Sequence, residues 1–248
     1  MRLGRGSSLV SLLAVLASAG CRQLLGIDEP GAASDAAVDT AIDATPPLHL
    51  TGTTRSIDLT GVHALGGVTL EWLSNDPMVP ATTSDATTGV FSIDVPRAGS
   101  GLTDGALHAT LTGYRPTYLY LPAPFDTDVA GIALFLTTQS TFNQMITATG
   151  VTPVMGDGVI LLGVVSSQDL PISGAVVTSS PSGVIRYDSG GAPSSSATVT
   201  ASDGVAYILN LAPGPVSANA SKNGLAFSPR AVVTHANATT ETGVRALP

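Results

Sequence analysis

Apolar and polar residues alternate in short segments along most of this chain, starting near residue 48. Residues 67–72 (GVTLEW) and residues 89–96 (GVFSIDVP) show the alternation most clearly. A period of two predicts strands with one buried face. That face carries Val68, Leu70 and Trp72 in the first segment and Phe91, Ile93 and Val95 in the second. Gly, Pro, Asp and Ser separate such segments throughout, a pattern typical of all-β sandwiches.

The order of these strand and turn signals occurs twice. Gly67 at the start of one predicted strand matches Gly174. Gly89 matches Gly204 before the longest alternating segment of each copy, and the small polar residues before both glycines predict a tight turn with φ > 0. A repeat of this length predicts two related folding units. We therefore expect a first sandwich over residues 48–137 and a second over residues 151–248.

One helical signal lies between the two copies. Ser140 or Thr141 is a suitable N-cap, and Gly150 suits the position after the last turn. The apolar residues between them, spaced as one helix face requires, are Phe142, Met145 and Ile146. We expect a short linking helix within residues 138–150, packed on a sandwich because so short a helix does not persist alone.

These segments resemble the carboxypeptidase regulatory-like family, a transthyretin-like sandwich related to the CnaB-type repeats of bacterial surface proteins. The resemblance rests on GGVTL at 66–70, ATTSDATTGVFSIDVP at 81–96 and Gly113-Tyr114 in the first copy, and on PISGAVVT at 171–178 and TASDGVAYILNLAPG at 200–214 in the second. The second copy lacks the tyrosine after Gly224. The resemblance implies two tandem antiparallel Greek-key β-sandwiches. Because such modules serve as spacers, stalks and enzyme appendages alike, it does not imply an activity.

The first 20 residues have the composition of an export signal. Arg2 and Arg5 precede a short apolar run, and Ser18-Ala19-Gly20 precede Cys21, the one cysteine of the chain. This run is shorter than the ~20 residues of a membrane-spanning helix. The string resembles the bacterial lipobox, although Ser18 replaces the usual leucine, and implies lipidation of Cys21. The alternative is ordinary cleavage after Ala19, which leaves a free thiol.

Residues 21–47 are predicted to be a lipidated N-terminus followed by an acidic, disordered Ala/Pro spacer. Removal of Arg2 and Arg5 with the signal leaves eight of the ten basic residues against 18 acidic ones. Such a balance argues against nucleic acid as a partner. The expected partner is the membrane, reached through the acyl chains. Arg22 after the cysteine, by resemblance to enterobacterial lipoproteins, favours export to the outer membrane, on its periplasmic or surface face.

We expect no catalytic residues, no metal site and no cofactor. The chain has no G-x-S-x-G, no Ser-x-x-Lys and no paired cysteines, and its four histidines stand alone, so we interpret them as solvent-facing strand residues. Asp85, Asp157 and Asp203 lie in Gly-containing turns, where Asp bonds its own backbone. Calcium at Asp126 and Asp128 is a weaker alternative, because the other acids of a calcium loop are missing. An enzyme whose site assembles from scattered His and Asp residues stays as a third hypothesis.

Residues 113–125 (GYRPTYLYLPAPF) contain the candidate ligand-binding residues. Tyr118 and Tyr120 fall on one strand face, with Arg115 and Phe125 flanking them. Exposed aromatic rings of this kind stack on sugars or bind peptides with little loss of entropy. Core packing is the alternative for this segment. The sequence thus predicts a lipid-anchored, non-catalytic envelope protein whose sandwiches act as spacer or interaction modules; the second reading is a surface lipoprotein that binds a glycan or peptide partner through this aromatic face.

Overall fold

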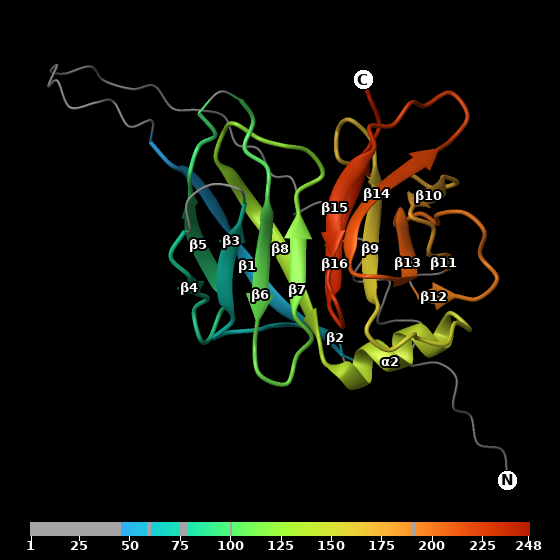
Figure 1. The fold of residues 1–248 in the computed structure, drawn as a ribbon, viewed down its shortest axis with the longest axis horizontal. Helices are drawn as coiled ribbons and strands as arrows, with labels where there is room; N and C mark the ends of the chain where they lie inside the picture. The colour runs from blue at the N-terminus through green and yellow to red at the C-terminus, as the bar shows by residue number, and fades with distance from the viewer. Residues whose placement is uncertain (1–45, 59–60, 75–78, 100, 190–191) are drawn as a thin grey trace, which may run out of the picture.

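The computed structural model describes residues 46–58, 61–74, 79–99, 101–189 and 192–248. These residues form sixteen strands and one helix (Figure 1). The predicted all-β class, two sandwiches with one short helix, is confirmed. Cys21 and the predicted spacer lie outside the described residues, apart from the last two positions of the spacer.

The first sandwich consists of two sheets. In one sheet β1 lies at the centre, with β5 and β2 along one edge and β8 along the other; the second sheet has the order β4-β3-β6-β7. The strands are β1 (Leu48–Asp58), β2 (Gly61–Ala64), β3 (Thr69–Leu73), β4 (Thr82–Thr83), β5 (Val90–Val95), β6 (Ala106–Thr110), β7 (Thr117–Tyr120) and β8 (Val129–Thr137). Between the sheets lie the residues predicted from the alternation, Val68, Leu70, Trp72, Phe91, Ile93 and Val95, all buried.

The second sandwich repeats this arrangement. One sheet has the order β12-β11-β13-β9-β16 and the other has the order β10-β14-β15. Its strands are β9 (Gly158–Val165), β10 (Val176–Ser180), β11 (Val184–Asp188), β12 (Pro193–Ser194), β13 (Val205–Leu211), β14 (Gly214–Ser221), β15 (Arg230–Thr234) and β16 (Thr239–Arg245). A second apolar core, which includes Ile160, Leu162, Ile208 and Val244, fills the space between its sheets.

The central strand pairings of the two sandwiches correspond. β1 pairs with β5 antiparallel and with β8 parallel, just as β9 pairs with β13 antiparallel and with β16 parallel. The facing sheets β3-β6-β7 and β10-β14-β15 are antiparallel in both copies. The first and last strands of each sandwich thus run side by side in one direction, so the sandwiches are not purely antiparallel as the resemblance implied.

The matched glycines Gly89 and Gly204 occupy the same tight turn. Each has φ of +70°, a region that side chains rarely adopt. The carbonyl of Gly89 accepts the N–H of Thr54 at 2.8 Å, and that of Gly204 accepts the N–H of Val164 at 2.8 Å. A Cβ atom at either glycine would lie 2.5 Å from the carbonyl oxygen of that same partner. The predicted turn is confirmed, and close backbone approach adds a second reason for glycine.

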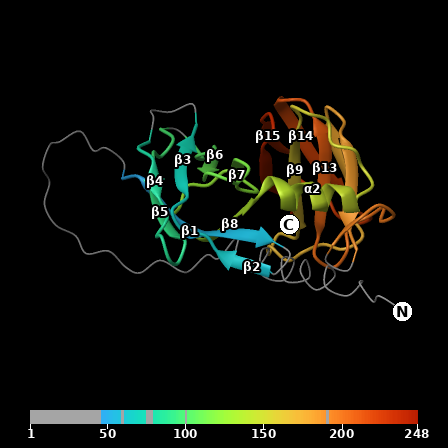
Figure 2. The ribbon, with the colours of Figure 1, turned by 90° about the horizontal axis from the view of Figure 1, so that it is seen from below.

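Strand β16 joins the two sandwiches. It lies between β9 and β7 and pairs parallel with both, so that one nine-stranded sheet runs through the whole molecule (Figure 1). On the β7 side the partners are Thr239 with Thr117, Tyr118 with Thr240 and Leu119 with Glu241. The sandwiches therefore lie side by side and share backbone hydrogen bonding (Figure 2).

The linking helix α2 (Gln139–Ala148) packs on the outer face of the second sandwich (Figure 2). Its N-cap is Thr138, whose extended backbone and Oγ1, which accepts the N–H of Thr141, meet the requirements of a cap. The predicted caps Ser140 and Thr141 are therefore wrong, since both lie within the first turn. Ile146 packs on Val159, Tyr207 and Leu209, which explains why β13 is apolar on both faces.

Candidate functional site

The four predicted ligand-binding residues do not form one surface. Phe125 packs edge to face on Trp72, with ring centroids 6.0 Å apart, at the margin of the first core. Tyr118 and Tyr120 face the second sandwich, and Arg115 lies near helix α2. The predicted aromatic strand face of β7 is thus part of the contact between the sandwiches.

The Tyr118 ring lies between two histidine rings. Its centroid is 4.3 Å from that of His108 on β6 and 3.7 Å from that of His235, which follows β15, and the rings of each pair are stacked and nearly parallel. The pKa of His235 is lowered, mainly by burial and to a smaller extent by the neighbouring His108, so this imidazole is neutral near pH 7. The interpretation of all four histidines as solvent-facing is therefore wrong for His108 and His235, since tertiary packing stacks them across the junction.

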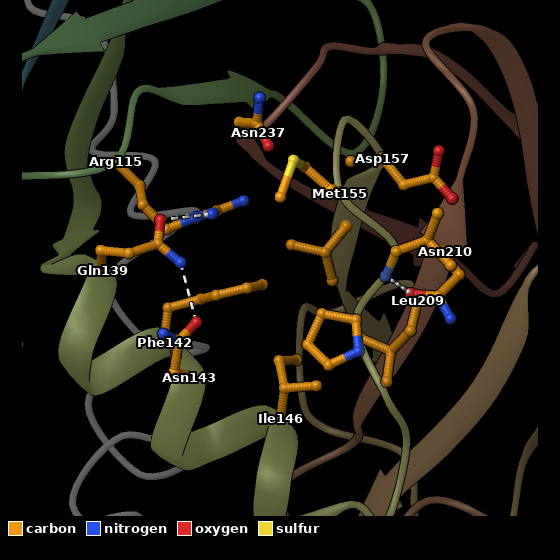
Figure 3. Close-up of a pocket in the computed structure, with 14 residues that line it drawn as sticks. Arg115, Gln139, Phe142, Asn143, Ile146, Met155, Asp157, Leu209, Asn210 and Asn237 are labelled. Carbon is orange, nitrogen blue, oxygen red and sulfur yellow. Dashed lines mark hydrogen bonds between the residues drawn. The ribbon is translucent and has the colours of Figure 1, made fainter.

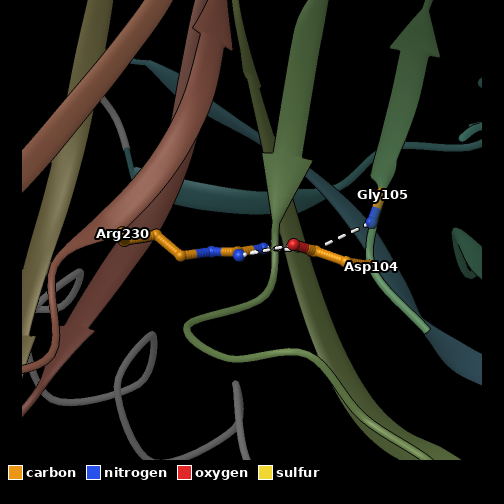
Figure 4. Close-up of polar contacts among 3 residues, drawn as sticks. All are labelled: Asp104, Gly105 and Arg230. Atoms are coloured by element: carbon orange, nitrogen blue, oxygen red, sulfur yellow. Dashed lines mark hydrogen bonds and ion pairs between the residues drawn. The ribbon is translucent and has the colours of Figure 1, made fainter. Parts of the chain in front are cut away.

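An ion pair between a buried arginine and a half-exposed aspartate lies in the same junction (Figure 4). Arg230 of the second sandwich donates from both terminal nitrogens to Asp104 of the first, at 2.8 and 2.5 Å. The Arg230 side chain is only 6% exposed, and its guanidinium lies 5.9 Å from the centroid of the Tyr120 ring. Two parallel N–H···O bonds fix both distance and orientation. Sequence reasoning missed this pair because Asp104 and Arg230 are far apart in the chain.

Glu241 on β16 is a third polar contact at this junction. It is 6% exposed, and its carboxylate accepts the backbone N–H of Phe135 on β8 at 3.4 Å. Burial raises the pKa of Glu241 to about 8, with the bond from Phe135 acting in the opposite direction. Glu241 therefore caps an edge amide of the first sandwich from within the second. A single acid in an otherwise uncharged stretch (TTETGV, residues 239–244) is the one sequence signal for it.

The acids predicted to lie in turns have backbone partners in two cases. Asp85 accepts the N–H groups of Thr88 and Thr87, and these bonds, with the Thr88 hydroxyl, lower its pKa. Asp203 accepts the N–H of Val205 at 3.1 Å. Asp203 is also buried next to Asp188, whose pKa rises to about 8 mainly through burial and then through the charge of Asp203. The turn interpretation of Asp85 and Asp203 is confirmed.

A groove of roughly 360 Å³ opens between α2 and the loop that enters β9 (Figure 3). Its apolar lining comes from Phe142 and Ile146 of α2 and from loop residues 153–155, of which Met155 is 96% exposed. Asn210 fastens the loop by accepting the N–H of Val154, and Asn237 fastens it by accepting the N–H of Gly156.

Arg115 occupies one wall of this groove, although it is only 6% exposed. Its terminal nitrogens donate to Gln139 Oε1 at 2.8 Å and to the Ala238 carbonyl at 3.3 Å. The guanidinium carbon lies 3.7 Å from the centroid of the Phe142 ring, a cation–π contact. Burial lowers the pKa of Arg115 to about 10, so it stays charged at neutral pH. Of the four predicted ligand-binding residues, Arg115 is the one that lines this groove.

Metal-binding clusters and membrane-spanning helices are both absent from the part of the chain that the structure describes. No three His, Cys, Asp or Glu side chains there are grouped so as to hold a metal ion. Nor is any helix among these residues long and apolar enough to span a membrane.

Comparison with known proteins gives no family. No family model matches the chain, and no curated protein does, so the resemblance to the carboxypeptidase regulatory-like family stays a prediction. The minor pilin GBS52 of Streptococcus agalactiae is 14% identical over 81% of this chain and 97% of that one, with a TM-score of 0.27. The shaft pilin SpaA of Lactobacillus rhamnosus GG is 13% identical over 82% of this chain and 98% of that one, with a TM-score of 0.25.

The Bacillus anthracis TIE protein is 13% identical over 81% of this chain, with a TM-score of 0.26. The matched region spans about a third of that longer protein, 34% of its length. At these identities and TM-scores the likeness decides nothing about function. The fold described above rests on the strand pairings of this chain itself.

Proposed function

We propose that this chain is an exported, non-catalytic envelope protein, anchored to the bacterial outer membrane through lipidated Cys21, whose two sandwiches act as one spacer and interaction module. The observation that carries the spacer role is the junction. A shared sheet, the Asp104–Arg230 pair and the ring stack at Tyr118 make one body of two sandwiches. A module that keeps its two ends a set distance apart needs such stiffness.

The placement of ionisable groups supports a role without catalysis. His49 binds Asp94, and His108 binds Glu71 on a strand surface. Among the described residues, three acids have raised pKa values: Asp188 and Glu241 are buried within the sandwiches, and Asp169 pairs with Arg245. None of the three lines the groove at α2. General acid–base chemistry requires such groups to converge on a cleft that substrate can enter.

The alternative, binding of a glycan or peptide by an aromatic strand face, requires the rings of Tyr118 and Tyr120 to face solvent. Tyr118 instead lies between two histidines, and Tyr120 packs against the core of the second sandwich. We therefore base no binding function on this face.

The anchor is tested by replacing Cys21. The wild-type chain, expressed in a Gram-negative host, should incorporate an alkyne-labelled fatty acid and sediment with the outer membrane, because two or more acyl chains bind membranes firmly. Cys21→Ser should lose the label and appear in the soluble fraction. The matched control Ser18→Leu, which restores the commonest lipobox residue, should keep both properties. Retention of Cys21→Ser in the membrane fraction would show that the anchor lies elsewhere.

A further inference from the structure

Arg115 is a buried cation without a counter-anion. No carboxylate of the described residues lies within ion-pair distance of it, and its Nε–H has no hydrogen-bond partner there. Arg230 is equally buried, but it has Asp104 as its carboxylate partner. A buried, unpaired charge destabilises a fold, so its presence calls for an explanation outside the packing of the fold.

The guanidinium is held in place at the groove. Gln139 accepts from Arg115 and donates to Asn143 Oδ1 at 2.8 Å, while the guanidinium carbon lies over the Phe142 ring (Figure 3). Among the described residues, only two of the five guanidinium N–H groups have partners, those to Gln139 and to the Ala238 carbonyl. Arg115 is therefore preorganised and still has donors to offer.

The other groups around the groove do not neutralise this charge. Asp157 is the one acid among the described residues that line it, and its carboxylate points away from Arg115 (Figure 3). The first turn of α2 contains no acidic residue. The positive end of that helix therefore adds to the charge of Arg115 rather than opposing it.

The rest of the groove is apolar. Phe142 and Ile146 form one side, and Pro153, Val154 and Met155 form the other. Val154 is 53% and Met155 96% exposed, so large apolar side chains face solvent at its rim. A ligand that suits this groove combines one anionic group with an apolar body.

We propose that the groove between α2 and residues 153–157 binds a carboxylate carried on an apolar body, such as the C-terminal residue of a peptide or a free acylated amino acid, with Arg115 as the residue that binds the carboxylate. The carboxylate supplies the missing counter-ion, and the apolar body covers Met155 and Val154. This site goes beyond the proposed spacer function and does not depend on lipidation.

The test uses the purified mature chain and calorimetric titration with N-acetyl-leucine and with its uncharged amide. The acid should bind at least about tenfold more tightly than the amide, because a hydrogen-bonded ion pair is lost with the charge. Arg115→Gln should abolish this preference. Arg97→Gln, which removes an arginine bonded to the Pro46 and Asp126 carbonyls, should leave it unchanged.

A second variant keeps the test decisive if Arg115→Gln fails to fold. Gln139→Glu places a carboxylate where Oε1 now lies 2.8 Å from Arg115 and so provides the counter-ion internally. It should raise the melting temperature and reduce binding of N-acetyl-leucine about tenfold.

A glycine-serine peptide ending in leucine, with a free or an amidated C-terminus, distinguishes the two sources of the carboxylate. Tighter binding of the peptide with a free C-terminus than of N-acetyl-leucine assigns the site to chain termini. Equal binding of acid and amide, or unchanged binding by Gln139→Glu, would overturn the proposal.

Discussion

At the scale of single residues, two matched glycines show how the sequence repeat becomes structure. Gly89 and Gly204 have the same φ and approach the same carbonyl position in the two sandwiches. The sequence predicted the turn from small polar neighbours before an alternating strand. It did not predict the close approach, because Thr54 and Val164 lie on the neighbouring strands.

Alanine at either glycine should therefore destabilise its sandwich by about 2–4 kcal/mol, more than conformational strain alone. Gly67→Ala is the matched control, because Gly67 has φ of +73° and no atom lies within 4 Å of the position that the alanine methyl carbon would take. It should cost only about 1–2 kcal/mol of the free energy of unfolding. Urea denaturation of the three variants measures the difference. Equal losses for Gly67→Ala and Gly89→Ala would show that the carbonyl contact does not matter.

Glu241 gives a second prediction, on pH. Its folded pKa of about 8 exceeds the ordinary value of 4.5, so the folded state holds the proton more tightly than the unfolded state. The resulting stability is complete below about pH 4.5 and is lost as pH rises towards 8. Glu241→Gln should thus raise the free energy of unfolding by roughly 2–4 kcal/mol at pH 8 and change it little at pH 4.

Asp188 titrates over the same range, so Glu241→Gln removes only part of the pH dependence. The exposed Asp126, replaced by Asn, serves as the control for loss of a surface carboxylate. Thermal unfolding across pH 4–9 provides the measurement. A Glu241→Gln variant with the wild-type profile would mean that this carboxyl group is not buried as described.

At the scale of strands and helices, local sequence patterns predicted individual elements but did not predict the pairing of strands that lie far apart in the chain. Alternation correctly predicted the buried faces of β3 and β5, and apolar spacing predicted α2, although its first turn begins earlier than expected. The pairing of β7 with β16 joins a late strand of the first copy to the last strand of the second, far along the chain. No local signal specifies it, so Tyr118 and Tyr120 looked like an exposed face. Arg115 was named from the same segment, but its burial against α2 was not foreseen.

The two partners of the ion pair, Asp104 in the loop before β6 and Arg230 at the start of β15, should contribute unequally to stability when each is replaced alone. Asp104→Ala leaves Arg230 buried and unpaired and should lower the free energy of unfolding by about 2–3 kcal/mol, less than for a fully buried pair because Asp104 is half exposed. Arg230→Met removes the buried charge and should cost only about 1 kcal/mol. The double variant should be more stable than Asp104→Ala alone, as a double-mutant cycle will measure. Equal effects of the two single substitutions would argue against burial of Arg230.

At the scale of the whole molecule, the two sandwiches form one body that a shared sheet holds together. The predicted division into residues 48–137, 138–150 and 151–248 follows the sequence repeat and stays a proposal, because β16 of the second unit also belongs to the sheet of the first. A single stiff body suits a spacer that holds the groove at α2 at a fixed place relative to the first sandwich. Two sandwiches on a flexible linker would not.

The distance between the two sandwiches in solution tests this account most directly. Ser92 on β5 and Ser217 on β14 are exposed, one on each sandwich, and their replacement by Cys in a Cys21→Ser background allows a nitroxide label at each. Pulsed electron paramagnetic resonance should give a single narrow distance distribution, and addition of Asp104→Ala should broaden it. A broad or two-peaked distribution in the chain that retains Asp104 would contradict a rigid junction and, with it, the spacer function.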